Sequence, residues 1–271
     1  MNTMENSFFD IGANLTHSSF DGELEQTLDG ALSAGVNRLS ITGSNLDESI
    51  KALKIAKLFP DYFISTAGIH PHHAKEYTAI YFSEIIDLLN YKEVKAIGET
   101  GLDFHRNYSS KEDQIKSFEA HLEIAIKTKK PLFLHERDAH EEFLNILKPL
   151  KEELPKTVVH CFTGNQEALN KYIEMGFYIG ITGWICDERR GKHLEEIVSL
   201  VPLDKLMVET DAPYLLPRDM GVKKSNKNEP KYLPHIVKKI SNHRMESLEL
   251  ITSSIYMNSL SFFGLSTQKN I

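Results

Sequence analysis

Residues 94–100 read VKAIGET, a short apolar run that ends at the carboxylate of Glu99 and is followed by a glycine. Similar runs recur along the whole chain. Most are continuously apolar, as is typical of strands that are buried on both faces of a parallel sheet. They predict eight strands, at residues 8–14, 38–44, 62–69, 94–100, 131–136, 157–163, 177–183 and 206–211.

Helical patterns separate these runs. In residues 23–34 leucines recur every fourth position and Gly35 follows as a stop signal, while residues 44–59 begin at Ser44, a typical N-cap, and end before Pro60. Further helices are predicted at residues 110–128, 139–150, 166–175 and 194–200.

Regular alternation of strands and helices predicts an α/β protein, and eight units in 271 residues fit a (β/α)8 TIM barrel. A doubly wound open sheet is the alternative. It is disfavoured because FDIGANLTH, after the first strand, carries a single glycine and no phosphate-binding fingerprint. We expect one domain over residues 1–271, with the irregular stretch 217–234 as a loop of the functional site.

Net charge, cysteine content and the length of the apolar runs limit the function and the location that the chain can have. A formal net charge of −7 argues against a tight, sequence-independent nucleic-acid binder, although it does not exclude a nuclease that must release its product. Two cysteines 25 residues apart predict no disulfide framework and favour a reducing cytoplasm. The sequence shows no signal peptide and no membrane-spanning run, so we expect a soluble cytoplasmic protein.

Ionisable residues stand at the ends of five predicted strands. In a TIM barrel the C-terminal strand ends form one rim, where active sites lie. Each residue has an ordinary structural role as well: an ion pair of the carboxylate with Arg137, satisfied core histidines, or a cap. Their common position nevertheless favours a metal site, whose expected ligands are Glu99, His135, His160 and Asp211. His70 is expected near the metal or the substrate.

The expected ligands are imidazoles and carboxylates. Cys161 is expected on the opposite strand face from His160, and Glu209 deeper in the barrel. Such a set suits Mg²⁺, Mn²⁺ or Zn²⁺, and a metal-bound water makes hydrolysis the natural reaction class.

Positive charge near the strand ends suits a phosphate-containing substrate. The segment 218–231 carries five basic and two acidic residues, the basic ones being Arg218, Lys223, Lys224, Lys227 and Lys231. Other residues of the strand-end loops could clamp phosphate or stack on bases: Arg106, Arg137, Arg189, Arg190, Phe104, Trp184 and Tyr214.

Seven strings in order resemble the TatD family of metal-dependent nucleases, in the amidohydrolase-like superfamily: DIGANLTH, AGIHPHH, IGETGLDF, LHERDAH, HCFTG, GITGWICDERRG and ETDAPYLLPRD. The resemblance covers nearly the whole chain. It implies a TIM barrel, divalent metal, a cytoplasmic location, 3′-to-5′ exonuclease action on single-stranded DNA or RNA, and a proposed part in repair of oxidised DNA. It also places Glu99, His135, His160 and Asp211 at the family's metal positions and His70 at its substrate end.

One departure concerns the first strand. Many relatives carry a His-x-His pair where this chain has Asn14 and Thr16, and His17 is out of phase by one residue. The departure argues against a tightly held second metal ion.

We therefore expect a monomeric enzyme that uses Mg²⁺ first, with Mn²⁺ or Zn²⁺ as alternatives. Asp211 and His70 are the expected catalytic residues, and His70, Arg137 and Arg218 the expected substrate contacts. Two other classes stay open: a metal-dependent hydrolase of acyl, amide or aminoacyl-ester bonds on the same barrel, which needs no basic loop, and a non-enzymatic scaffold.

Overall fold

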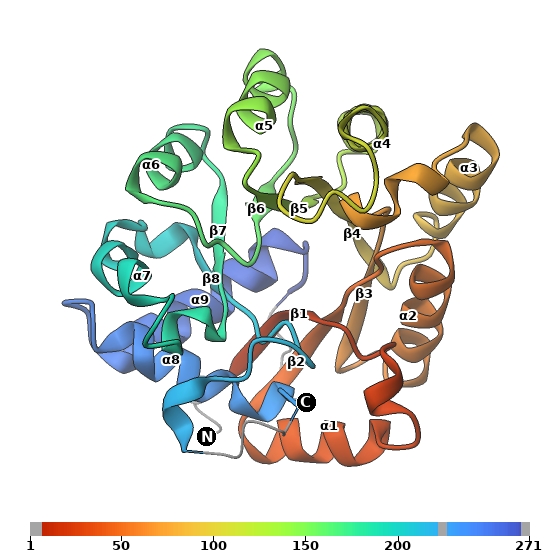
Figure 1. The fold of residues 1–271 in the computed structure, drawn as a ribbon. Coiled ribbons are helices and arrows are strands. Elements are labelled where there is room, and N and C mark those ends of the chain that lie inside the picture. The colour runs from red at the N-terminus through yellow and green to blue at the C-terminus, as the bar shows by residue number, and fades with distance from the viewer. Residues whose placement is uncertain (1–6, 222–226, 267–271) are drawn as a thin grey trace.

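The computed structural model describes residues 7–221 and 227–266, and it contains one eight-stranded parallel sheet. The strands are neighbours in the order in which they occur in the chain, and the helices lie around the outside of the sheet (Figure 1). The predicted barrel is confirmed. Its strands are β1 (Phe8–Ala13), β2 (Val36–Ile41), β3 (Phe63–Ala67), β4 (Val94–Asp103), β5 (Leu132–Arg137), β6 (Thr157–Val159), β7 (Tyr178–Ile181) and β8 (Leu206–Val208).

The predicted helices are present, with small changes at their ends. Asn45, rather than Ser44, caps the second helix by accepting from the amide of Glu48, and Gly35 ends the first at a φ of 83°. Three of the α-helices, α3, α8 and α9, were not among the predicted ones. The set is α1 (Leu24–Ser33), α2 (Leu46–Leu58), α3 (Ala79–Leu88), α4 (Lys111–Thr128), α5 (His140–Leu147), α6 (Gln166–Glu174), α7 (Lys192–Ile197), α8 (Leu233–Ser241) and α9 (Leu248–Phe262).

Hydrogen bonds between β1 and the segment after β8 close the barrel. The amide of Asp211 donates to the carbonyl of Gly12 at 2.8 Å, and the amide of Asn14 donates to that of Ala212 at 2.7 Å. The amide of Thr210 donates to the buried carboxyl group of Asp10 at 2.9 Å. These contacts place Asp211 beside Asn14 at the rim.

The barrel interior is packed with apolar side chains. Phe9, Ile11, Phe133 and Met207 are fully buried there. At the N-terminal end of the strands Phe263, just after α9, stacks on Phe9 with ring centroids 5.4 Å apart. The interior is therefore a solid support for the opposite rim, as in other barrels of this type.

Two glycines in β4 allow it to lie close against β5. A Cβ at Gly98 would be 2.2 Å from the carbonyl oxygen of Phe133, and one at Gly101 would be 2.0 Å from that of His135. Both glycines have a φ near 140°, which L-residues with side chains rarely adopt. Because β4 continues past them to Asp103, it carries two carboxylates towards the rim.

Among the described residues, no helix is long and apolar enough to cross a membrane.

Candidate metal centre

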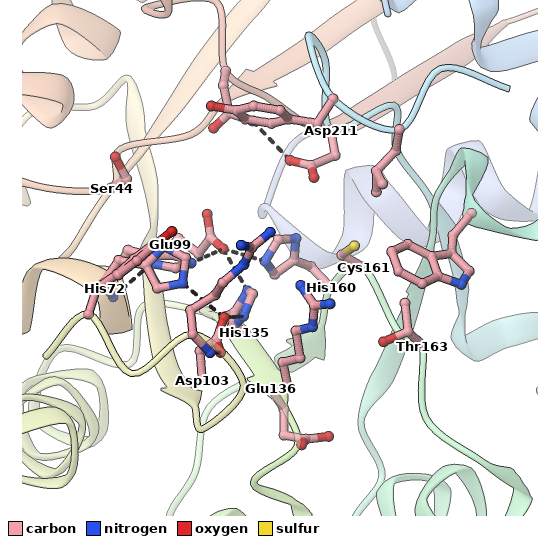
Figure 2. A pocket seen from close by; sticks show the side chains of 18 of the residues that line it. Ser44, His72, Glu99, Asp103, His135, Glu136, His160, Cys161, Thr163 and Asp211 are labelled. Atoms are coloured by element: carbon pink, nitrogen blue, oxygen red, sulfur yellow. Dashed lines mark hydrogen bonds and ion pairs between the residues drawn. The ribbon is translucent and has the colours of Figure 1, made fainter. Parts of the chain in front are cut away.

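A cavity of about 580 Å³ opens at the C-terminal ends of the strands (Figure 2). All five ionisable residues predicted from the strand ends line it. Strands β4 and β5 contribute side chains to its wall directly, and segments that follow the other six strands supply the rest. The lining includes Asn14, Ser44, His70, His72, Glu99, Asp103, Arg106, Tyr108, His135, Arg137, His160, Cys161, Trp184, Arg190, Asp211 and Tyr214.

The carboxylate of Glu99 is the centre of the site. Its Oε1 atom lies 3.2 Å from Nε2 of His70, 3.0 Å from Nδ1 of His135 and 2.8 Å from Nε2 of His160. Burial alone would raise the pKa of Glu99, but the positive charge of His160 and hydrogen bonds from His135 and His160 hold it well below its usual range. Glu99 is therefore ionised and only 6% exposed.

His70 is held in place by residues from another part of the chain. The amide of Ile69 donates to Nε2 of the buried His121 in α4 at 3.1 Å, and Nδ1 of His121 lies 2.7 Å from the carbonyl oxygen of Ser117. Nδ1 of His70 accepts from the amide of His72, so the hydrogen-bond network assigns its proton to Nε2, facing Glu99. Burial lowers the pKa of His70 to about 4, which keeps this imidazole neutral at ordinary pH.

Asp103 is a second carboxylate of the site, and it was not among the residues predicted from the sequence. Its Oδ2 atom lies 2.9 Å from Nε2 of His72 and 3.4 Å from Nε2 of His135. Against the effect of burial, these imidazoles hold the pKa of Asp103 far below its usual range. A signal was available, because Asp103 is four residues after Glu99 and so lies on the same face of a continuing strand.

His160 lies between two carboxylates. Its Nε2 atom contacts Glu99, and its Nδ1 atom is 3.4 Å from Oε2 of the fully buried Glu209. Burial opposes the charged imidazolium, but Glu99 and Glu209 together raise the pKa of His160 well above its usual range. The ring also stacks on Phe133 of the barrel interior, with centroids 4.4 Å apart.

Asp211 faces this cluster from the other side of the cavity (Figure 2). It has a left-handed backbone conformation, with a φ of 54°, and its Oδ1 atom accepts from Nδ2 of Asn14 at 2.9 Å. Burial, with the negative charges of Glu99 and Glu209, raises the pKa of Asp211 to about 7 against the opposing effects of His160 and Asn14. Asn14 thus takes part in the site as a donor to Asp211.

The expectation that the side chain of Cys161 lies on the opposite strand face from His160 was wrong. Cys161 lines the same cavity as His160 because the chain leaves β6 at Val159 and Cys161 adopts a left-handed conformation with a φ of 45°. Strand alternation therefore no longer holds at this position. Burial and the charge of Asp211 raise the pKa of the Cys161 thiol well above its usual range, so it is uncharged.

Arginines and aromatic rings also line the cavity. The guanidinium of Arg190 lies 4.2 Å from the ring centroid of Trp184, and that of Arg137 lies 6.0 Å from the same ring. Tyr108 and Tyr214 are about half exposed on the same wall. Phe104 is not among the lining residues and packs under Lys111.

The predicted basic loop contributes less than expected. Arg218 is not among the cavity-lining residues, since its guanidinium donates to the Glu188 carboxylate at 3.1 Å. Lys227 pairs with Glu23 and Lys231 with Glu229. Lys223 and Lys224 lie outside the described residues.

The rim cluster fits a divalent metal ion. One donor atom from each of His70, Glu99 and His135 lies within 4.8 Å of the others. In the described part of the chain Nε2 of His135 and Nδ1 of His160 are buried without a hydrogen bond, although carboxylates are near. Converging imidazoles and carboxylates with unused donor capacity are typical of a metal centre.

The fold and the rim cluster define a metal-dependent hydrolase on a (β/α)8 barrel. The chain belongs to the TatD related DNase family, whose model matches residues 9–264. It is 49% identical over 259 residues to the 3′-5′ ssDNA/RNA exonuclease TatD of Escherichia fergusonii, covering 95% of this chain and 99% of the relative. The 3′-5′ ssDNA/RNA exonuclease TatD of Escherichia coli K12 is 47% identical over 258 residues, covering 95% of this chain and 99% of that relative.

Solved structures agree on the fold. A TatD-family hydrolase from Entamoeba histolytica superposes with a TM-score of 0.86 at 26% identity, covering 96% of this chain and 99% of that one. A TatD homologue from Escherichia coli K12 superposes with a TM-score of 0.89 at 24% identity, with 97% and 100% covered.

Proposed function

We propose that this protein is a divalent-metal-dependent exonuclease that removes nucleotides from the 3′ end of single-stranded DNA and RNA. The observation that carries the proposal is the buried Glu99 carboxylate with three imidazoles around it, set in a cavity whose wall also carries arginines and aromatic rings. The curated relatives named for this activity match almost the entire chain, which supports the same substrate class.

The proposed metal ligands are Glu99, His135, His160 and, from the opposite side of the cavity, Asp211, with His70 beside them. A divalent ion held there would supply a hydroxide at neutral pH and neutralise charge on the scissile phosphate. Asp211, oriented by Asn14, is positioned to accept the proton of the attacking water.

The remaining wall residues would hold the terminal nucleotide. Arg137 can contact phosphate oxygens with two parallel hydrogen bonds, and the exposed rings of Tyr108 and Tyr214 can stack on unpaired bases. His70 contributes a neutral N–H group at the metal end of the cavity. Arg218 remains a proposed phosphate contact, and it would have to exchange Glu188 for the substrate.

For the identity of the ion we propose Mg²⁺, with Mn²⁺ and Zn²⁺ as alternatives. Phosphate oxygens and the carboxylates supply the oxygen ligands that Mg²⁺ prefers, whereas the imidazoles suit Mn²⁺ and Zn²⁺. We further propose that the protein is a monomer and that it acts in the cytoplasm. The free thiols of Cys161 and Cys186 support the cytoplasmic location. A part in repair of oxidised DNA stays a prediction of the family resemblance.

The test is a panel of substrates with the Glu99→Ala variant. Single-stranded DNA, double-stranded DNA, RNA and aminoacyl-tRNA are incubated with the chelator-treated protein and Mg²⁺, Mn²⁺ or Zn²⁺. We expect metal-dependent shortening of single strands from the 3′ end, and its loss in Glu99→Ala, because the carboxylate that gathers the imidazoles is gone.

Glu174→Ala removes an exposed carboxylate on α6 and is the matched control. It should retain full activity, and thermal unfolding should show both variants folded. Undiminished digestion by folded Glu99→Ala would refute the site. Cleavage of the aminoacyl ester without digestion of any strand would instead establish the acyl-hydrolase alternative.

A further inference from the structure

Three side chains of different chemistry meet outside the rim cavity. Cys186 ends the 3₁₀ helix η5 (Gly183–Cys186), Asp219 lies in the 3₁₀ helix η8 (Arg218–Met220), and His235 lies in the first turn of α8. These three elements pack against one another, because η5 contacts both α8 and η8. One thiol, carboxylate and imidazole atom from this trio all lie within 4.8 Å of each other.

The separations are close to those of a tetrahedral metal site. Zinc–ligand distances of 2.0–2.3 Å place neighbouring donor atoms about 3.3–3.8 Å apart, so adjustments of about 1 Å would suffice. Nε2 of His235 is already 2.6 Å from Oδ1 of Asp219. Cys186 is 2% exposed, whereas the other two side chains are about one-third exposed, so an ion and a water ligand can reach the trio from solvent.

The surrounding charges also allow a cation to bind. The ammonium group of Lys239 lies near the trio, but its Nζ atom is 2.6 Å from Glu195 and 3.8 Å from Oδ2 of Asp219. Glu195 thus largely neutralises it and leaves the negative charge of Asp219 available. Burial and that charge raise the pKa of the Cys186 thiol well above its usual range, and a divalent cation would reverse this effect by binding the thiolate.

We propose that Cys186, Asp219 and His235 form a second metal site, separate from the rim centre, which binds Zn²⁺ with a water molecule as its fourth ligand. A thiolate, an imidazole and a carboxylate are the donor set of zinc rather than of Mg²⁺. The role is structural. Trp184 lies two residues before Cys186, so the ion would tie this cavity wall to α8 and to the segment that follows Asp211.

Cobalt is the probe that tests the proposal, because a Co²⁺–thiolate bond gives a near-ultraviolet charge-transfer band that imidazole and carboxylate ligands do not give. The full-length protein is stripped of metal under reducing conditions and titrated with Co²⁺. We expect the band in the wild type and in Cys161→Ser, and its loss in Cys186→Ser. Elemental analysis after zinc loading should show one ion fewer per chain in Cys186→Ser.

A second pair of variants guards against misfolding at the buried cysteine. His235→Gln changes a partly exposed ligand and should weaken cobalt binding at this site at least tenfold. His243→Gln changes a histidine of similar exposure that is also near Glu195 but outside the trio, and should leave binding unchanged. The proposal is overturned if the wild type gives no band, if the band persists in Cys186→Ser, if Cys161→Ser abolishes it, or if His235→Gln binds as the wild type does.

Discussion

The hydrogen bond from Asn14 to Asp211 offers a sharp test of the proposed proton acceptor. Asn14→Leu replaces the amide with an apolar group of similar size, and so removes the donor that lies 2.9 Å from Oδ1 of Asp211. A hydrogen bond to a charged group contributes about 1.5–3 kcal/mol. Because Asp211 is only partly buried, we take about 2 kcal/mol, which corresponds to a loss of roughly 30-fold in kcat/KM.

The pH dependence should change as well. Asn14 favours the ionised form of Asp211, whose pKa burial has already raised to about 7. Removal of the donor raises this pKa further, so the ionised base appears only at higher pH. The acid limb of the kcat/KM profile should therefore shift to higher pH, measured as 3′-nucleotide release from a single-stranded oligonucleotide at saturating metal.

Thr16→Val is the matched control, since Thr16 lies two residues away and lines the adjacent hollow rather than the main cavity. It should leave both kcat/KM and the acid limb unchanged. If Asn14→Leu stays within twofold of the wild type across the pH range, or if Thr16→Val loses as much, Asp211 does not depend on Asn14 in the way we infer.

Three further predictions concern stability and metal. Gly101→Ala should lower the free energy of unfolding by about 3 kcal/mol or more, since its Cβ would meet the carbonyl of His135. Gly176→Ala, at a residue with a φ of 80° and open space around it, should lower it by only about 1 kcal/mol. Equal urea midpoints for the two variants would contradict this. His121 has its pKa lowered to about 4 by burial, so the unfolded chain takes up its proton first as pH falls below 6.5. Between pH 7 and pH 5 this histidine should cost about 2 kcal/mol of stability, and His121→Gln should lack that part of the slope in urea unfolding. Chelation should abolish nuclease activity while far-ultraviolet circular dichroism persists, because the apolar interior does not depend on the ion; loss of the fold would show otherwise.

Much of the fold could be predicted because buried parallel strands are continuous apolar runs. The predicted runs and the observed strands coincide within a few residues, except where polar ends were included: β6 stops at Val159 and β8 at Val208. Helix α3 was missed because its sequence, AIYFSEIIDL, is apolar on most sides and lacks a clear amphipathic period.

The part of the site that lies at the ends of the predicted strands could be predicted from the sequence. Glu99, His135 and His160 meet because the strand ends of a barrel share one rim. Asp103 was missed because the predicted strand ended at Thr100, whereas the glycines let β4 continue. The direction of Cys161 depends on a left-handed φ, which apolar periodicity does not encode.

Trp184 is the single tryptophan of the chain, and it lies in the cavity wall with a guanidinium over its ring. All indole fluorescence of the protein therefore originates at this one position. A nucleotide that stacks nearby or draws Arg190 away would change the emission directly, so the unmodified protein carries its own optical reporter of substrate binding. Titrations could be followed without a label and under non-hydrolysing conditions, which separates binding from turnover.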